Sequence, residues 1–232
     1  MFEYLRTPKG IALIAVFAAL HTVLSSLPYT ITIGVSGSIT LGVVSAPLLG
    51  ILLGPISGGV ATMIGSIIAM FTNPAGAFMG AASFIPATVG AISTGFVIKK
   101  RGYISAALLA VGILAFYLQP SAGQLLEYPF MHIIALIIAL IFSTKLAMWD
   151  PELSDLTKLS LAIPIAAFVG TLTDHITGSS IAAWMFDLGP EVFSPVLFVY
   201  PIERIVAVII AAAIAIPLYY SLKRSGIFDL IK

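Results

Sequence analysis

A serine and a histidine in glycine-containing patterns are the first candidates for chemistry in this sequence. Ser36 lies between Gly34 and Gly37 in the stretch ITIGVSGSITLG, which fits G-x-S-G, and His175 is followed by Gly178. A nucleophilic serine needs a base within hydrogen-bonding distance and donors that stabilise an oxyanion. This serine follows only the first of several apolar segments, and the Gly, Thr and Pro residues around it are typical of an extended loop. We therefore expect no catalytic residue, and we interpret Gly34, Ser36 and Gly37 as part of a loop that gates a binding site.

Polar and aromatic side chains gather at one predicted membrane level in the last third of the chain, between residues 173 and 204. Carboxylate and imidazole groups there can form hydrogen bonds, and a guanidinium can bind a carboxylate or phosphate. Aromatic faces can hold a ring or a cation. The predicted substrate-binding set, with an asparagine between two earlier apolar segments, is Asn73, Asp174, His175, Trp184, Tyr200, Glu203 and Arg204.

The same residues have a structural interpretation that the sequence leaves open. Trp184 and Tyr200 would suit an aromatic belt at the membrane surface. Pro201 could begin a helix, with Glu203 favoured near its positive end and Arg204 extending outward.

Several kinds of chemistry are not expected. The sequence has no cysteine, which excludes thiolate metal sites and cysteine nucleophiles. His21 falls in the outer half of the first apolar segment, and we interpret His132 as a residue of the membrane interface. Because the histidines and acids are scattered, we expect no metal and no cofactor. A glycine-rich phosphate loop and a basic patch with interleaved aromatics are both missing from the sequence, so ATP hydrolysis and nucleic-acid binding are not expected.

The composition predicts an all-α, polytopic membrane protein. Hydrophobic residues make up 59% of the 232 residues and charged residues only 9%, too few for the surface of a soluble domain. Hydropathy predicts about eight spans in one integral membrane domain, 1–232. Gly54 and Pro55 alone separate the second span from the third and predict a tight turn. The predicted spans are 11–27, 40–54, 56–72, 77–98, 104–119, 129–148, 159–176 and 198–222.

The basic residues predict the orientation of these spans. With both termini in the cytoplasm, all Lys and Arg except Arg204 fall on the cytoplasmic side, as the positive-inside rule requires. We therefore expect a multi-pass protein of a prokaryotic plasma membrane. The cytoplasmic set is Arg6, Lys9, Lys99, Lys100, Arg101, Lys145, Lys158, Lys223, Arg224 and Lys232.

Small residues at helical spacing predict close helix packing, because lipid gives no hydrophobic drive for association and small side chains let backbones approach. In the two spans around Gly54, in Gly76-x-x-x-Gly80 and in Ala91-x-x-x-Gly95, we expect packing within the bundle. In the first span, an external partner is an alternative for the stripe that includes Ala15 and Ala19.

These features together resemble the substrate-binding S components of energy-coupling factor (ECF) transporters. The resemblance lies in IALIAVFAAL with Ala15 and Ala19, in LLGILLGPISGGVATMIGSI, and in YPIERIVAVIIAAAIAIPLYYSLKR, and it covers residues 10–100 and 159–224. It implies capture of a small vitamin-like micronutrient from outside and no ATPase activity. It also implies docking through Ala15 and Ala19 onto a transmembrane coupling protein with ATPase subunits, and closure of the first outer loop over the ligand.

One departure from that family concerns the number of spans. The family has six, so residues 104–149 read as an inserted helical hairpin that begins and ends on the cytoplasmic side. The alternatives are a self-contained secondary transporter or channel, and an intramembrane serine protease of the rhomboid type, whose motifs the Ser36 and His175 patterns resemble.

Overall fold

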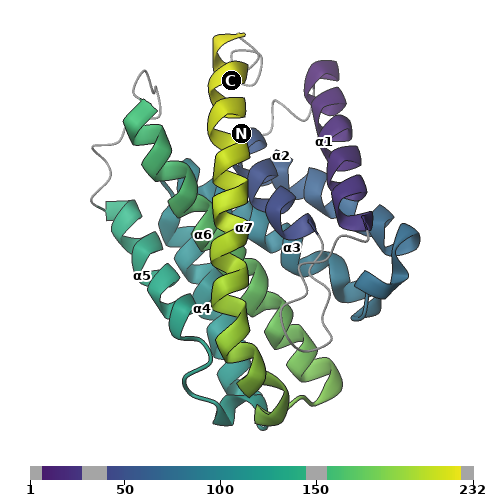
Figure 1. The fold of residues 1–232 in the computed structure, drawn as a ribbon, viewed down its shortest axis with the longest axis vertical. Helices are drawn as coiled ribbons and strands as arrows, with labels where there is room; N and C mark the ends of the chain where they lie inside the picture. Colours follow the sequence, from purple (N-terminus) through teal and green to yellow (C-terminus); the bar gives the residue numbers. More distant parts are fainter. Residues whose placement is uncertain (1–6, 28–40, 145–155, 226–232) are drawn as a thin grey trace.

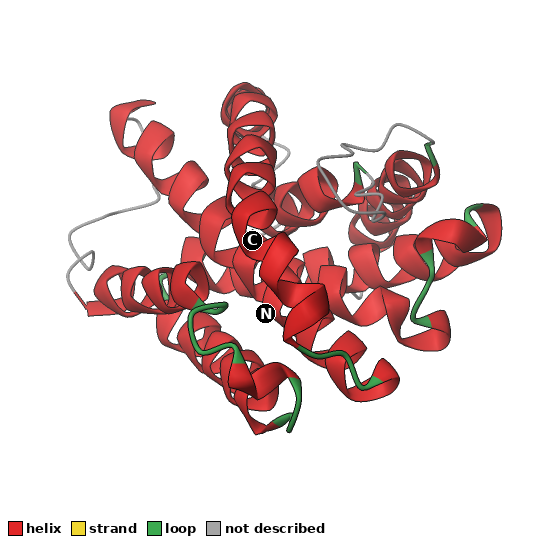
Figure 2. Ribbon diagram, turned by 60° about the horizontal axis from the view of Figure 1, so that its bottom comes forward, coloured by secondary structure: helices red, strands yellow, loops and turns green. Residues whose placement is uncertain are grey.

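The computed structural model describes residues 7–27, 41–144 and 156–225, and within these ranges it contains helices, turns and no strand (Figures 1 and 2). The all-α prediction is confirmed. The α-helices are α1 (Pro8–Ser26), α2 (Gly42–Thr72), α3 (Ile85–Ile98), α4 (Gly102–Leu118), α5 (Phe130–Thr144), α6 (Leu156–Phe186) and α7 (Pro190–Arg224). Three short 3₁₀ helices join them: η2 (Pro74–Gly76), η3 (Gly80–Phe84) and η4 (Ala122–Gln124).

The helices have the length and composition of membrane-spanning segments. Five in the described ranges are long and apolar enough to cross a bilayer: Pro8–Ser26, Gly42–Thr72, Gly80–Ile98, Ser160–Phe186 and Pro190–Leu222. Gly102–Leu118 and Phe130–Phe142 are apolar but shorter. The count of about eight crossings and the side of each terminus stay predictions.

Helix α2 turns back on itself at Gly54. Its backbone there has φ 77° and ψ −178°, a conformation open to glycine, and Pro55 follows. Ser45 and Ser66, on either side of this turn, both contact the ring of His21 in α1. In a straight helix their separation along the axis would be about 30 Å. The tight turn predicted at Gly54 and Pro55 is therefore present, and α2 consists of two arms that lie side by side.

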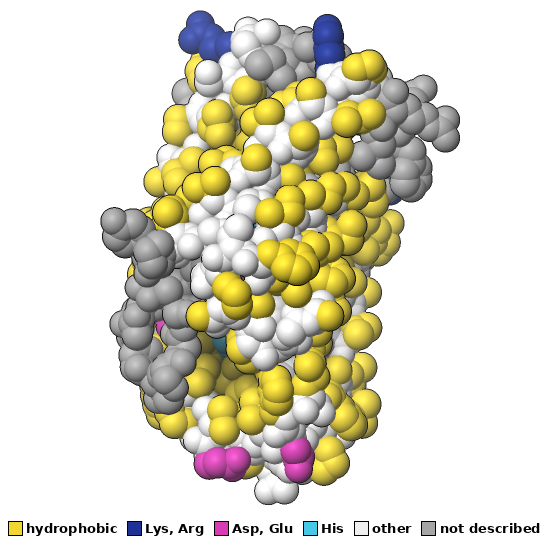
Figure 3. Space-filling view, turned by 90° about the vertical axis from the view of Figure 1, so that its right-hand side faces the viewer, with side chains coloured by type: hydrophobic (Ala, Val, Ile, Leu, Met, Phe, Trp, Pro, Cys, Tyr) yellow, Lys and Arg dark blue, Asp and Glu magenta, His cyan; other side chains and the backbone are white. Residues whose placement is uncertain are grey.

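Charged side chains mark the two ends of the molecule. Figure 3 shows Lys and Arg at one end and Asp and Glu at the other, with a largely apolar surface between them. The Gly54 turn lies at the basic end, close to the side chain of Lys99 at the end of α3. This distribution has the form that the positive-inside rule gives to a membrane protein.

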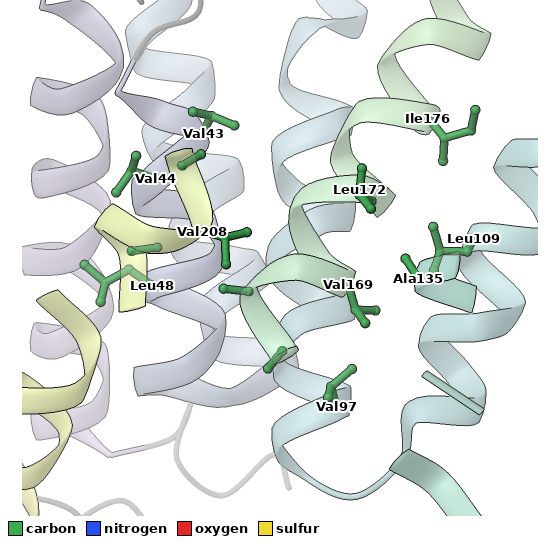
Figure 4. Close-up of a cluster of buried hydrophobic side chains, with 14 of the residues drawn as sticks. Val43, Val44, Leu48, Val97, Leu109, Ala135, Val169, Leu172, Ile176 and Val208 are labelled. Atoms are coloured by element: carbon green, nitrogen blue, oxygen red, sulfur yellow. The ribbon is translucent and has the colours of Figure 1, made fainter. Parts of the chain in front are cut away.

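The core is built from apolar and small side chains of several helices. Leu172, Val169 and Ile176 of α6 point toward Leu109 of α4 and Ala135 of α5 in Figure 4. The small residues of α2 and α3, among them Gly50, Ala91 and Gly95, are buried where these helices pack together, as predicted. Gly76 and Gly80 are exposed in the irregular segment between α2 and α3. The packing predicted for that pair is wrong, because the spacing lies outside any α-helix.

The predicted hairpin 104–149 is represented by α4 and α5, which pack against each other and against α6. Polar bonds also tie α4 to its neighbours. The Ser105 hydroxyl donates to the Ser93 carbonyl at 2.7 Å, and the Ser180 hydroxyl donates to the Gly112 carbonyl at 2.8 Å. The two helices of the predicted insertion are therefore packed into the bundle.

Candidate functional site

A cavity of about 720 Å³ lies in the half of the molecule nearer the acidic end, among residues of α1, α2, η2, η3, α3, α6 and α7. Figure 3 shows a hollow in this half, with a histidine side chain inside it. The cavity has the size of a site for a small molecule, and it combines apolar walls with a few polar groups. Of the predicted site residues, Asn73, Asp174, His175, Glu203 and Arg204 line it.

An ion pair joins α6 to α7 in the cavity wall. Arg204 Nη1 lies 3.3 Å from Asp174 Oδ2, and the two side chains are only 9% and 16% exposed. Gly90 of α3 lets this part of α6 approach, because a Cβ added to Gly90 would lie 2.7 Å from the Cβ of Asp174. Arg204 Nε is buried and has no hydrogen-bond partner among the described residues. The guanidinium therefore keeps a free donor.

A second carboxylate in the wall has no such partner. Glu203 lines the cavity and is 9% exposed, and within the described part of the chain it forms no ion pair and no hydrogen bond. Glu191, which also borders the cavity, is exposed and accepts a hydrogen bond from the Gly189 amide at 3.2 Å. The acidic groups thus lie both within the cavity and at its rim.

Two histidines and two tyrosines form a buried layer on one side of the cavity. His132 Nε2 lies 3.0 Å from His175 Nδ1, and the ring of Tyr200 stacks on both imidazoles at centroid distances of 5.3 and 4.6 Å. The Tyr200 hydroxyl donates to the Tyr128 carbonyl at 2.9 Å. His175 and Tyr128 reach the cavity, whereas His132 and Tyr200 lie behind them.

Tyr128, in the loop between η4 and α5, connects this layer to α6. Its hydroxyl lies 2.9 Å from the Ser179 hydroxyl. Burial raises the pKa of the Tyr128 phenol above its usual value, and the hydrogen bond to Ser179 opposes this only in part. The phenol is therefore a neutral polar group at the cavity.

The structure places three of the aromatic and histidine residues singled out in the sequence outside the cavity lining. His132 is fully buried inside the bundle. Trp184 is 56% exposed, outside the cavity lining, and its indole N–H donates to the Ala115 carbonyl at 2.8 Å. Tyr200 lies in the second layer, so neither residue offers its face to the cavity. Phe78, Tyr128 and Phe193 line it instead, and no sequence motif had singled them out.

His21 joins α1 to both arms of α2. Its Nδ1 lies 2.6 Å from the Ser45 hydroxyl and its Nε2 lies 2.9 Å from the Ser66 hydroxyl. The residue is buried, and it also borders the cavity. A serine beside a histidine is the geometry of a nucleophile and its base. Ser66, however, lies inside α2, where backbone N–H groups are used in the helix and cannot form an oxyanion site. The hydrogen bonds of His21 with Ser45 and Ser66 join α1 to both arms of α2, and we call these three residues the polar brace.

The same two helices are held by further hydrogen bonds at the acidic end. The Thr22 hydroxyl donates to the Gly65 carbonyl at 3.1 Å, and the Asn73 side chain donates to the Ser25 carbonyl at 3.3 Å. Asn73 is thus the C-cap residue of α2, joins this helix to α1, and lines the cavity.

The small residues of α1 divide between two faces. Ala18 is buried against α2, whereas Ala15 and Ala19 are exposed. The predicted docking residues are therefore on the outer face of the bundle. The predicted gating residues Gly34, Ser36 and Gly37 lie outside the described residues.

The part of the chain that the structure describes contains no group of three or more His, Asp and Glu residues suited to a metal ion.

Comparison with known proteins gives one relative. An uncharacterized protein of Methanocaldococcus jannaschii is 31% identical over 152 residues, which are 66% of this chain and 51% of the relative. The chain thus spans about half the length of the curated relative it matches. No family model matches the sequence, and no solved structure matches it.

Proposed function

We propose that the protein is a membrane-embedded substrate-capture subunit of an ECF-type importer, which binds a small water-soluble micronutrient at its outer face. The observation that carries the proposal is the cavity near the acidic end, where Asp174, His175, Glu203 and Arg204 meet apolar walls. Ionisable groups at membrane depth are costly, so their concentration around one cavity favours a ligand site.

The separation of basic and acidic side chains at opposite ends of the molecule supports a role in uptake. In this proposal the chain crosses the membrane eight times, because each arm of α2 counts as a crossing, and the basic end faces the cytoplasm. The cavity then opens on the outside, where a nutrient would be captured.

The exposed face of α1 supports a second part of the proposal. Ala15 and Ala19 form a smooth surface toward which a coupling protein with ATPase subunits could pack closely. On the opposite side of the same helix, His21 and Ser25 border the cavity. Helix α1 thus connects the ligand site with the proposed docking surface.

Small molecules that remain bound during purification test the capture function. Ala87 lines the cavity, and Ala87→Trp would place an indole inside it and occupy part of its volume. Ala107 is exposed on α4, and Ala107→Trp is the matched control. We expect mass spectrometry to find a compound released from the wild type and from Ala107→Trp but not from Ala87→Trp. The same compounds in equal amounts from all three proteins would contradict capture in this cavity.

A self-contained secondary transporter is a second candidate. It is favoured by the His132–His175 pair and the Asp174–Arg204 pair, because transporters use linked ionisable groups inside the bundle. Purified protein in liposomes distinguishes the two functions. Uptake of the released compound without any other protein would support the secondary transporter, and uptake that requires the ATPase subunits and ATP would support the importer.

A further inference from the structure

We propose that the ligand of this cavity is a small organic cation whose positive group pairs with Glu203. The inference rests on the proposed capture function and names the chemistry of its ligand.

The charge balance of the cavity is the first argument. Asp174, Glu191 and Glu203 border it, and Arg204 is the one Lys or Arg among the described residues that line it. Arg204 is already paired with Asp174 at 3.3 Å. Glu203 precedes Arg204 in α7, and adjacent helical residues project about 100° apart, which explains why Glu203 forms no ion pair with it. Among the described residues, the Glu203 carboxylate thus has no ion-pair partner, and Arg204 attracts it only without direct contact.

A buried carboxylate without a direct ion-pair partner is unfavourable, since burial removes its hydration and the more distant Arg204 offsets that loss only in part. A cationic ligand would supply the partner, and its own desolvation would be offset by the same contact. Exposed Glu191 at the rim would raise the local concentration of cations before they enter.

The walls indicate an organic cation rather than a metal ion. No three metal-binding side chains gather anywhere in residues 7–27, 41–144 and 156–225. Met70, Phe78 and Phe193 give the cavity an apolar and aromatic lining. Such walls suit the carbon body of a ligand, and aromatic faces attract an ammonium or a charged heterocycle.

The experiment compares Glu203→Gln with Glu127→Gln, the same substitution at an exposed glutamate outside the cavity lining. Each protein is purified without added ligand, and the released compounds are identified by mass spectrometry. We expect the wild type and Glu127→Gln to release a compound with a positively charged nitrogen. The amount from Glu203→Gln should be lower by about tenfold, as expected for a lost charge-assisted contact.

Thermal unfolding with three probes of matched size and different charge gives a second measurement that needs no retained ligand. Benzylamine, benzyl alcohol and benzoate share one ring and differ in charge at neutral pH. We expect benzylamine to stabilise the wild type most and to lose this effect in Glu203→Gln. Because glutamine removes a buried charge that has no ion-pair partner among the described residues, ligand-free Glu203→Gln should unfold at the wild-type temperature or above it. This result would separate lost binding from lost folding.

Other results overturn the proposal in distinguishable ways. A neutral or anionic compound that Ala87→Trp fails to retain would keep the capture function and overturn the cation assignment. So would a cation that Glu203→Gln retains fully, or equal stabilisation by all three probes. If Ala87→Trp loses no compound and no probe stabilises the wild type, both the cation assignment and the capture function fail.

Discussion

The imidazole rings of His132 and His175 lie with their planes 4° apart, and Nε2 of the first is 3.0 Å from Nδ1 of the second. One ring must therefore donate to the other, which fixes complementary tautomers in the pair. Since His175 borders the cavity and His132 does not, the buried ring orients the one that a ligand can reach.

Replacing His132 tests this orientation. His132→Phe keeps a flat ring but leaves His175 Nδ1 without its partner, so we expect the protein to lose about 1–3 kcal/mol of stability. His132→Gln retains an amide that can bond to His175 and should cost less. Unfolding of both variants in detergent, followed by circular dichroism, gives the comparison. Equal losses would mean that the hydrogen bond contributes little and that the ring is present only for packing.

The Asp174–Arg204 pair predicts non-additive mutations. Arg204→Leu leaves a buried carboxylate alone, and we expect a loss of roughly 2–4 kcal/mol. Adding Asp174→Asn removes that charge and should recover part of the loss. A double-mutant cycle measured by unfolding in mixed micelles provides the coupling energy. Strictly additive effects would show that the two side chains do not interact in solution.

Close packing between α3 and α6 predicts a strong effect at Gly90. A Cβ at this position would lie 2.7 Å from the Cβ of Asp174, so Gly90→Ala should displace α6 and cost about 1–3 kcal/mol. Gly178 is the matched control in α6, because an added Cβ there meets Pro86 at 3.4 Å, an ordinary contact. The melting temperature of Gly90→Ala should lie below that of Gly178→Ala. Equal temperatures would refute the predicted clash.

Substitutions on α1 test the proposed docking surface. Ala15→Trp and Ala19→Trp add bulk to exposed positions, so they should leave folding and ligand retention intact while preventing association with the coupling protein. Ala18 is 3% exposed, and Ala18→Trp should unfold the protein instead. Co-purification with the ATPase subunits measures association. Normal association of Ala15→Trp and Ala19→Trp would move the interface elsewhere.

Most of the helices could be predicted from the sequence, because a segment that crosses lipid can be recognised from its own residues alone. A segment must satisfy its own backbone hydrogen bonds and present apolar side chains, so hydropathy and breakers such as Gly54-Pro55 reveal the helices. Asp174, His175, Glu203 and Arg204 line one cavity, as expected for residues assigned to the same membrane level, and their role in substrate binding stays a prediction.

The sequence did not predict whether individual aromatic side chains point toward lipid, the core or the cavity. Trp184, Tyr200 and His132 were placed by their distance from the ends of spans, which gives depth but not direction. Whether a ring meets lipid, the core or the cavity depends on how the helices rotate against one another, and this is set by long-range packing. Tyr128 reaches the cavity from a loop between two helices, a position without any periodic pattern.

The polar brace around His21 also has a consequence for synthesis. The hydrogen-bond partners described for His21, Thr22 and Ser25 are supplied by α1 itself and by residues up to Asn73. When that residue has left the ribosome, the first helix can satisfy its buried imidazole without waiting for α6 or α7. In the nascent chain, α1 and the two arms of α2 can thus assemble first, and the later helices can pack against them.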